Sequence, residues 1–198
     1  MKPTCHILIL FLLCFFLNLC EKSNSENPSE NHFRIEEKTT RINTAALVKL
    51  RGNRLLNDMK AVLMASEGIE FASNQNQVLK ITGAGSLMGF IIHSKKQEEL
   101  TNGDYFINLR PPFEEGDIAV GFYTLNWNEK DIIDFYEKVE GASLLAGKVS
   151  VLQKKDFISL TFSFTDEQGK ILSGIYNGPL QKNLIYPTDH IDLDNQNL

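Results

Sequence analysis

The sequence predicts an all-β domain, an antiparallel β-sandwich of about eight or nine strands, with a lipocalin-like β-barrel as the alternative. The clearest segment, at residues 157–165, reads FISLTFSFT and alternates apolar with hydroxyl side chains. This strict period of two is typical of a half-buried strand. Further short apolar segments are separated by turn-forming residues about every 8–12 positions, which is the spacing expected in a sandwich or barrel.

Length and composition suit one soluble domain and exclude several classes of protein. The chain has 198 residues, of which 42% are hydrophobic and 23% charged. This balance is ordinary for a globular protein and unlike that of collagen, a coiled coil or a long disordered chain. The 20 Lys and Arg residues are outnumbered by 25 Asp and Glu residues, which leaves a net charge of −5. A nucleic-acid-binding domain carries a basic surface, so we expect no nucleic-acid partner.

Residues 1–20 are predicted to be a secretory signal peptide. One positive charge, Lys2, precedes an apolar run from Ile7 to Leu19. This run is shorter than the ~18–20 residues that a membrane-spanning helix needs, and a polar stretch begins directly after it. A signal anchor that stays uncleaved is the alternative interpretation of the same residues.

The three cysteines of the chain all lie in this first segment, at positions 5, 14 and 20. Cys20 stands at the apolar-to-polar boundary in LNLCEK, which resembles a bacterial lipobox, where a signal peptidase cuts before a cysteine that then carries lipid. Leu17 fits this motif, whereas Leu19 occupies a position where a small residue is usual. We therefore predict lipid attachment at Cys20, with an incidental cysteine as the alternative.

The rest of the chain is predicted to divide into three parts. Residues 21–33, EKSNSENPSENHF, are polar and typical of a flexible tether. Residues 34–180 are expected to form the β domain, which is long enough for one well-buried core. Residues 181–198 are rich in Asn and Asp and are predicted to be a disordered tail. None of these parts contains cysteine, which excludes disulfides and a thiol nucleophile there.

The first half of the β domain contains five predicted strands. Leu87 to Ile92 is apolar on both faces, as expected of a central strand that is covered on two sides. The Gly83-Ala84-Gly85 run before it allows a sharp bend. Pro111-Pro112 ends a later strand, because proline cannot donate to a strand ladder. The five strands are expected at residues 45–50, 59–65, 87–92, 104–108 and 118–125.

The second half is predicted to be a three-stranded antiparallel meander over residues 145–177. Residues 145–152 and 157–165 are joined by a short hairpin connection, and a turn at Gly169 leads into a third strand at 170–176. The buried face of the middle strand is expected to carry Ile158, Leu160, Phe162 and Phe164.

One segment fits two structures. Residues 128–141, NEKDIIDFYEKVEG, place apolar side chains at helical spacing between a capping Asn128 and a terminating Gly141. The same apolar side chains also have high strand propensity. A short helix at residues 129–140 is the preferred interpretation, and a strand is the alternative.

Five short motifs follow one another along residues 60–180. They are SEGI at 66–69, GAGSLMGF at 83–90, LTNGDY at 100–105, GKVSV at 147–151 and GKILSGIYNGPL at 169–180. Each motif alone marks only a strand and a turn. In this order they resemble a family of secreted Bacteroidetes all-β lipoproteins of unknown function. The resemblance implies an all-β lipoprotein and supplies no catalytic residues.

No motif predicts a catalytic residue, a cofactor or a metal. The Gly83-Ala84-Gly85 run lacks the third glycine of a dinucleotide-binding loop, because Met88 occupies that position. No G-x-S-x-G motif of a hydrolase occurs. His93 is far in sequence from any second metal-ligating histidine. The run Asp189, Asp192 and Asp194 resembles a calcium loop, but no Glu follows at its twelfth position.

A cluster of carboxylates remains as a candidate for hydrolysis. Glu114, Glu115 and Asp117 follow a Pro-Pro pair, and Asp104 is a candidate partner. A glycan hydrolase needs two carboxyl groups held about 5–9.5 Å apart across a cleft. Turns and loops also collect acidic residues, so solvated loop acids are the simpler interpretation.

Two aromatic residues are candidates for ligand binding. Tyr123 is expected to share one face of strand 118–125 with Ala119 and Gly121, and Trp127 continues the same parity. Aromatic rings beside small residues can stack on a sugar ring. Core packing is the simpler interpretation, because aromatic residues dominate protein cores.

Together these features predict a non-enzymatic lipoprotein of the cell envelope, exported by its signal and held at the outer membrane or cell surface through Cys20. It would act as a binding or structural accessory module, with a glycan or an envelope protein as partner. A glycan hydrolase and a barrel-type carrier of small apolar ligands are the alternatives. Two opposed carboxylates in a cleft would favour the hydrolase, and an apolar barrel cavity would favour the carrier.

Overall fold

A computed structural model confirms that the protein is all-β. The chain divides into two units, Met1–Glu30 and Asn31–Leu198, and the fold described below belongs to the second. The part of the chain that the structure describes contains fourteen strands and no helix. It comprises residues 30–51, 58–95, 99–130, 133–134, 138–139, 141–155 and 157–187, and for 133–134 and 138–139 the description covers the backbone alone.

The strands differ widely in length. The three longest, β6, β8 and β11, each pair with three neighbours along their course. The strands are β1 (His32–Ile35), β2 (Lys38–Arg41), β3 (Thr44–Arg51), β4 (Met59–Ala65), β5 (Ile69–Ser73), β6 (Leu79–His93), β7 (Gly103–Ile107), β8 (Asp117–Asn128), β9 (Ile133–Asp134), β10 (Lys138–Val139), β11 (Ala142–Lys154), β12 (Phe157–Asp166), β13 (Ile171–Pro179) and β14 (Gln181–Pro187).

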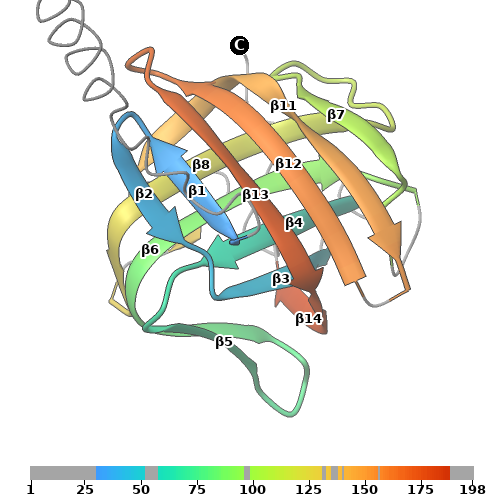
Figure 1. The fold of residues 1–198 in the computed structure, drawn as a ribbon. Helices are drawn as coiled ribbons and strands as arrows, with labels where there is room; N and C mark the ends of the chain where they lie inside the picture. Colours follow the sequence, from blue (N-terminus) through green and yellow to red (C-terminus); the bar gives the residue numbers. More distant parts are fainter. Residues whose placement is uncertain are drawn as a thin grey trace, which may run out of the picture. The chain divides into compact units, whose positions relative to one another are not determined.

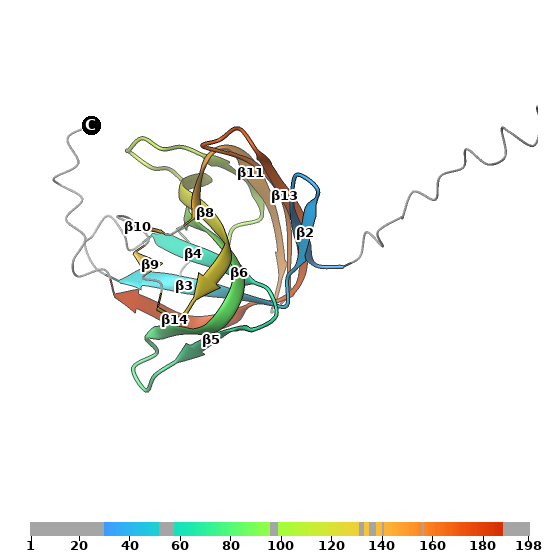
Figure 2. The ribbon, with the colours of Figure 1, turned by 90° about the vertical axis from the view of Figure 1, so that its left-hand side faces the viewer.

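Twelve of these strands form one sheet. Its order is β14-β3-β4-β6-β8-β7-β11-β12-β13-β1-β2, with β5 paired to the first part of β6, and β9 and β10 form a separate ribbon. The sheet is mixed rather than purely antiparallel as predicted, because β14 pairs with β3 and β7 with β8 in parallel. It curls on itself: β11, β12 and β13 cross in front of β3, β4 and β6 in Figure 1 and face them across the interior in Figure 2.

The curled sheet encloses a large inner core. The period-two residues of β12 point into it, and Phe162 and Phe164 are 3% and 1% exposed. Their rings lie 6.0 Å apart between centroids, and Phe90 from β6 meets Phe164 at 5.9 Å. Burying one such side chain contributes about 1.5–3 kcal/mol, and the contact between Phe90 and Phe164 joins the two halves of the sheet.

The opposite face of β3, β4 and β6 carries a second, outer core. Leu63 on this face is fully buried, and Phe71 of β5 belongs to the same core. The β5–β6 hairpin thus lies over the outer face. Beyond it, a bridge between Val78 and Ile185, with a 2.8 Å hydrogen bond from Ile185 N to Gln77 O, joins the hairpin to β14. Both faces of these central strands are therefore shielded from water.

Strand β6 serves both cores because alternate residues of its second half face opposite sides of the sheet. Its second half, Leu87–Ile92, lies between β4 and β8 and is buried on both faces, as predicted for a central strand. Its first half pairs with β5 instead. The change occurs at Gly83, whose φ of 91° favours glycine, and a Cβ there would collide with the carbonyl oxygen of Gly68.

The folded unit begins earlier and ends later than predicted. Phe33, assigned to the tether, lies in β1 and is fully buried. Leu184, assigned to the disordered tail, lies in β14 and is 2% exposed in the outer core. In both places apolar side chains within a polar stretch are buried in a core, and an edge strand of the sheet offers hydrogen bonds to the backbone.

The preferred helix at residues 129–140 is wrong. In this segment the described residues form β9 and β10, which pair antiparallel, and Asn128 is the last residue of β8 rather than a helix cap. The alternative interpretation, strand, follows from the β propensity of the Ile, Phe, Tyr and Val residues in the segment.

The meander predicted at residues 145–177 is confirmed as β11-β12-β13. The hairpin between β11 and β12 turns at Lys155, and the next turn lies between Asp166 and Lys170. The five upstream strands are also present as β3, β4, β6, β7 and β8. The short strands β1, β2 and β5 were missed, because four or five residues hold too few alternations to stand out. The equally short β7 was predicted because Pro111-Pro112 marks its end.

Candidate functional site

Two features noted in the sequence lie outside the described residues. These are Cys20, the expected lipid attachment site, and the aspartate run that begins at Asp189, which was not predicted to bind calcium. Lipid attachment at Cys20 stays a prediction. The structure does place the candidate carboxylates, the two candidate aromatic residues and one further surface that sequence reasoning missed.

Tyr123 is a buried residue of the inner core. It is 7% exposed, and its hydroxyl donates a 2.7 Å hydrogen bond to Oδ2 of Asp166. The other carboxylate oxygen accepts the backbone N–H groups of Gln168 and Lys170 at 2.9 and 2.8 Å. Burial, and then the adjacent carboxylate, raise the pKa of Tyr123 far above its usual value. The pair thus ties β8 to the turn between β12 and β13.

Asp166 stays ionised although it is buried. Burial by itself would raise the pKa of its carboxyl group, but the hydrogen bonds from Tyr123, Lys170 and Gln168 outweigh that effect. The pKa of Asp166 therefore lies below its ordinary value of 3.8. All of these donors belong to the fold itself, so the pair has a structural role.

Trp127 lies on the opposite face of β8 from Tyr123, which corrects the predicted shared face. It is 4% exposed and belongs to the outer core, whereas Tyr123 belongs to the inner one. The cause is a bulge: Gly85 and Leu87 of β6 pair with Trp127 and Thr124 of β8, so a step of two residues faces a step of three. The extra residue reverses the alternation. Both aromatic rings pack in cores, which was the simpler interpretation.

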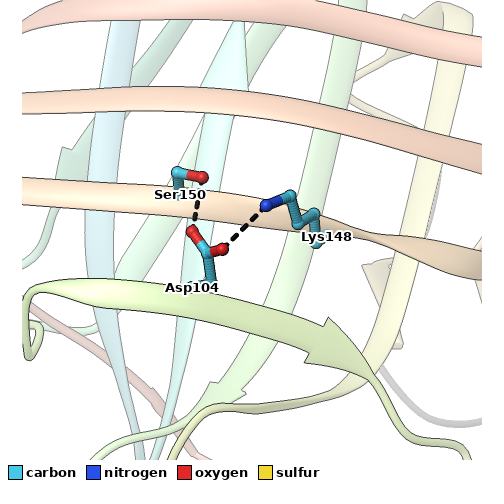
Figure 3. A network of polar contacts seen from close by, with 3 residues as sticks. All are labelled: Asp104, Lys148 and Ser150. Carbon is cyan, nitrogen blue, oxygen red and sulfur yellow. Dashed lines mark hydrogen bonds and ion pairs between the residues drawn. The ribbon is translucent and has the colours of Figure 1, made fainter.

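Asp104 belongs to an exposed polar network between β7 and β11, shown in Figure 3. Its Oδ2 lies 2.7 Å from Nζ of Lys148, and its Oδ1 accepts a 2.6 Å hydrogen bond from Oγ of Ser150. These hydrogen bonds, that of Lys148 first, lower the pKa of Asp104. A nucleophilic serine would direct its proton to a base. Ser150 directs it to a carboxylate whose lowered pKa makes it a weak base, so we interpret the network as a cross-strand contact of an exposed sheet face.

Two of the three carboxylates after the Pro-Pro pair, Glu115 and Asp117, accept hydrogen bonds from different loop residues. Glu115 accepts hydrogen bonds from Oγ1 of Thr101 at 2.6 Å and from the backbone N–H of Lys95 at 2.8 Å. Burial alone would raise the pKa of Glu115, but these bonds lower it. Asp117 accepts a 2.9 Å hydrogen bond from Nδ2 of Asn108 and a 2.7 Å bond from the backbone of its own loop. These contacts agree with the loop interpretation.

A basic pocket opens where β3 ends and β4 begins. Its volume is about 580 Å³. Lys49 and Lys60 are directly opposite each other in the β3–β4 pair, and Arg51 follows Lys49 by two residues, so strand alternation places all three on one face. Lys60 is only 2% exposed, and its Nζ donates a 2.5 Å hydrogen bond to the backbone oxygen of Ser94. The lining residues are Lys49, Leu50, Arg51, Asp58, Met59, Lys60, Gln77, Lys95 and Ile185.

The sequence held one signal of this pocket. Strand β4 reads MKAVLMA, and Lys60 is the only charge in an otherwise apolar run that is buried throughout. Buried lysines are rare unless they are paired. The run was predicted as a strand, but its buried lysine was not predicted as part of a site.

No metal site emerges from the described residues. They contain no group of three or more His, Cys, Asp or Glu side chains that could hold a metal ion. His93 ends β6, and its Nδ1 is buried without a hydrogen-bond partner. Among these same residues, none forms a helix with the length and hydropathy needed to cross a membrane.

Comparison with known proteins adds no relative. No family model matches the chain, and no curated protein or solved structure matches it either. The resemblance to secreted Bacteroidetes lipoproteins stays a prediction from the order of motifs. The function must therefore be argued from the residues of this chain alone.

Proposed function

We propose that the protein is a lipid-anchored module of the cell envelope that acts by binding rather than by catalysis. Its signal peptide would direct export, and lipid on Cys20 would hold it at the outer membrane or cell surface. The support is the lipobox-like sequence LNLCEK followed by a polar stretch. The partner would be a glycan or another envelope component.

The filled interior is the observation that carries the binding role. A carrier of small apolar ligands needs an open apolar cavity. In this protein the large side chains of the inner core occupy that space, and Phe33, Phe90 and Tyr105 are at most 2% exposed. A partner would therefore meet the outer surface or the ends of the strands, as expected of a binding module.

We also propose that the sheet works as a sandwich-like scaffold. Its two halves face each other across a core of interdigitated rings, such as Phe90 against Phe164. This packing supports a filled scaffold over a hollow barrel, although one continuous sheet supplies both halves.

The positions of the acidic residues support the absence of catalysis. Asp104, Glu115 and Asp117 each accept hydrogen bonds from different loops or strands. Glu114 is exposed beside them. A hydrolase would instead aim two such groups at one substrate.

Membrane fractionation tests this proposal. Each buried CH₂ of an acyl chain contributes about 0.8 kcal/mol to membrane binding, and stable anchoring needs more than one chain. Cys20→Ala should release the protein into the soluble fraction or block its maturation. Cys14→Ala, in the same apolar segment, should leave membrane partition and fatty-acid labelling unchanged. Equal membrane partition of the Cys20→Ala variant and the natural protein would disprove the lipid anchor.

A further inference from the structure

The basic pocket concentrates positive charge in a protein whose net charge is negative. Among the described residues that line it, Lys49, Arg51, Lys60 and Lys95 are cations and Asp58 is a carboxylate. The whole chain carries a net charge of −5. A local excess of cations against the overall charge makes this pocket attractive to anions.

The strand register brings the cations of the pocket close together. Lys49 and Lys60 are direct cross-strand partners, and like charges in such a pair are destabilising. Lys60 is also almost completely buried, and removing a charge from water carries a large penalty. Lys49, Arg51 and Lys60 take part in other contacts of the fold as well. A bound anion would add to these contacts.

Apolar neighbours strengthen the attraction. The row across the sheet at this level runs from Ile185 through Lys49 and Lys60 to Ile92. Ile92 is fully buried, so the cations stand beside the inner core. Charges next to apolar surface interact more strongly than charges in water, because the surroundings screen them less.

The size and the donors of the pocket indicate the class of ligand. A volume of about 580 Å³ falls within the usual range for small-molecule sites and exceeds the needs of a single oxyanion. Arg51 offers a planar fork that suits two oxygens of one phosphate, and lysines add point charges. We propose that this pocket binds a phosphate-bearing small molecule or headgroup. This inference rests on the proposed binding role and names the chemistry of its ligand.

Titration with inorganic pyrophosphate tests the site. The purified full chain in detergent, at an ionic strength of about 0.1 M so that distant charges are screened, should bind pyrophosphate, and bound ligand should raise its melting temperature. Lys49→Gln combined with Arg51→Gln should raise the Kd at least about tenfold, because two charge-assisted contacts are lost. Arg51→Lys should also weaken binding, since it keeps the positive charge but loses the planar guanidinium group that can donate to two oxygens at once.

A matched pair of charge changes serves as the control. Lys38→Gln combined with Arg41→Gln removes the same charge from β2, which ends the strand order on the side away from β14. These exposed residues should change the Kd by no more than about twofold, because long-range charge effects are screened. Equal weakening by both pairs, or no binding to the natural protein, would overturn the proposal. If the variant with both Lys49→Gln and Arg51→Gln fails to fold, the Kd of Arg51→Gln alone, at an exposed position, is compared with that of the control pair.

Vesicles separate the two sources of phosphate. The Cys20→Ala variant should be mixed with vesicles of neutral phosphatidylcholine, with or without an anionic phospholipid. Binding to anionic vesicles that Lys49→Gln and Arg51→Gln abolish would identify a headgroup, and binding of pyrophosphate alone would identify a soluble ligand. Both results support the phosphate site. Because neither needs the anchor, failure of the lipid-anchor experiment leaves this test intact.

Discussion

Phe162 and Thr161 are neighbours in β12 but lie in different environments. Phe162 is 3% exposed and stacks near Phe164 in the inner core, whereas Thr161 points outward to solvent. Truncating a buried Phe removes its burial energy and leaves a cavity, while an exposed threonine has neither to lose. The local alternation that the sequence predicted therefore decides which residue matters for stability.

We expect Phe162→Ala to lower the free energy of unfolding by about 3–5 kcal/mol. Thr161→Ala should change it by no more than about 0.5 kcal/mol, as is usual for surface substitutions. Urea denaturation of both variants measures the difference. A larger loss in Thr161→Ala than in Phe162→Ala would mean that the hydroxyl face of β12 lies inside.

The Tyr123–Asp166 pair should make part of the stability depend on pH. The pKa of Asp166 is lower in the folded than in the unfolded protein, so its contribution is present above 3.8 and is lost as the pH falls through the folded value. Tyr123→Phe removes one donor to this carboxylate and should cost about 1.5–3 kcal/mol at neutral pH. Urea denaturation at several pH values should show this difference shrinking below 3.8. A difference that grows on acidification would contradict the assignment.

At the scale of elements, β8 shows how a bulge redirects side chains. Two register shifts interrupt its pairing with β6, one between Gly85 and Leu87 and one between Ile91 and Ile92 of that strand. As a result Ala119 and Trp127 join the outer core while Tyr123 joins the inner one. A predicted face of four residues is thereby divided between two cores, because each bulge reverses the alternation once.

Substitutions in β14 test whether the folded domain extends to this strand. Leu184 is buried in the outer core, and the backbone of β14 pairs in parallel with β3. Leu184→Ala should therefore lower the free energy of unfolding by about 2–5 kcal/mol. Gln181→Ala, at an exposed position of the same strand, should be nearly neutral. If both variants were as stable as the natural protein in urea, the segment would behave as the disordered tail first predicted.

At the scale of the whole molecule, one continuous sheet builds two cores. The strand order joins the last strand, β14, to β3, and the first strand, β1, to β13. The C-terminal strand thus pairs near the beginning of the domain and the N-terminal strand near its end. These pairings connect residues far apart in the chain, which is costly in loop-closure entropy and typical of slowly folding β proteins.

Circular dichroism tests the fold class. The mature protein should give a spectrum dominated by β structure, because the described residues contain strands and no helix. A helical content above about a quarter would contradict the fold, since an average globular protein already has about 30–35% helix. Thermal unfolding followed by circular dichroism should show one cooperative transition, because the two cores share β3, β4 and β6.

The sequence by itself determined the fold class and most of the central strands. Period-two alternation in β12 and the doubly apolar run Leu87–Ile92 are local patterns, and the backbone converts each directly into a strand and its buried faces. The expected N-terminal signal and the lipid site at Cys20 also rest on local patterns, and they stay predictions.

Only the tertiary structure decided which strands pair, where bulges fall and which charges meet. Trp127 lies on the opposite face from the one predicted because β8 has an extra residue at the bulge. Leu184 is buried because β14 pairs with the otherwise unpaired edge of β3. Lys49 and Lys60 became neighbours through the register of two strands. None of these contacts is encoded in a local period, because each depends on the free energy of burying surfaces that are distant in the chain.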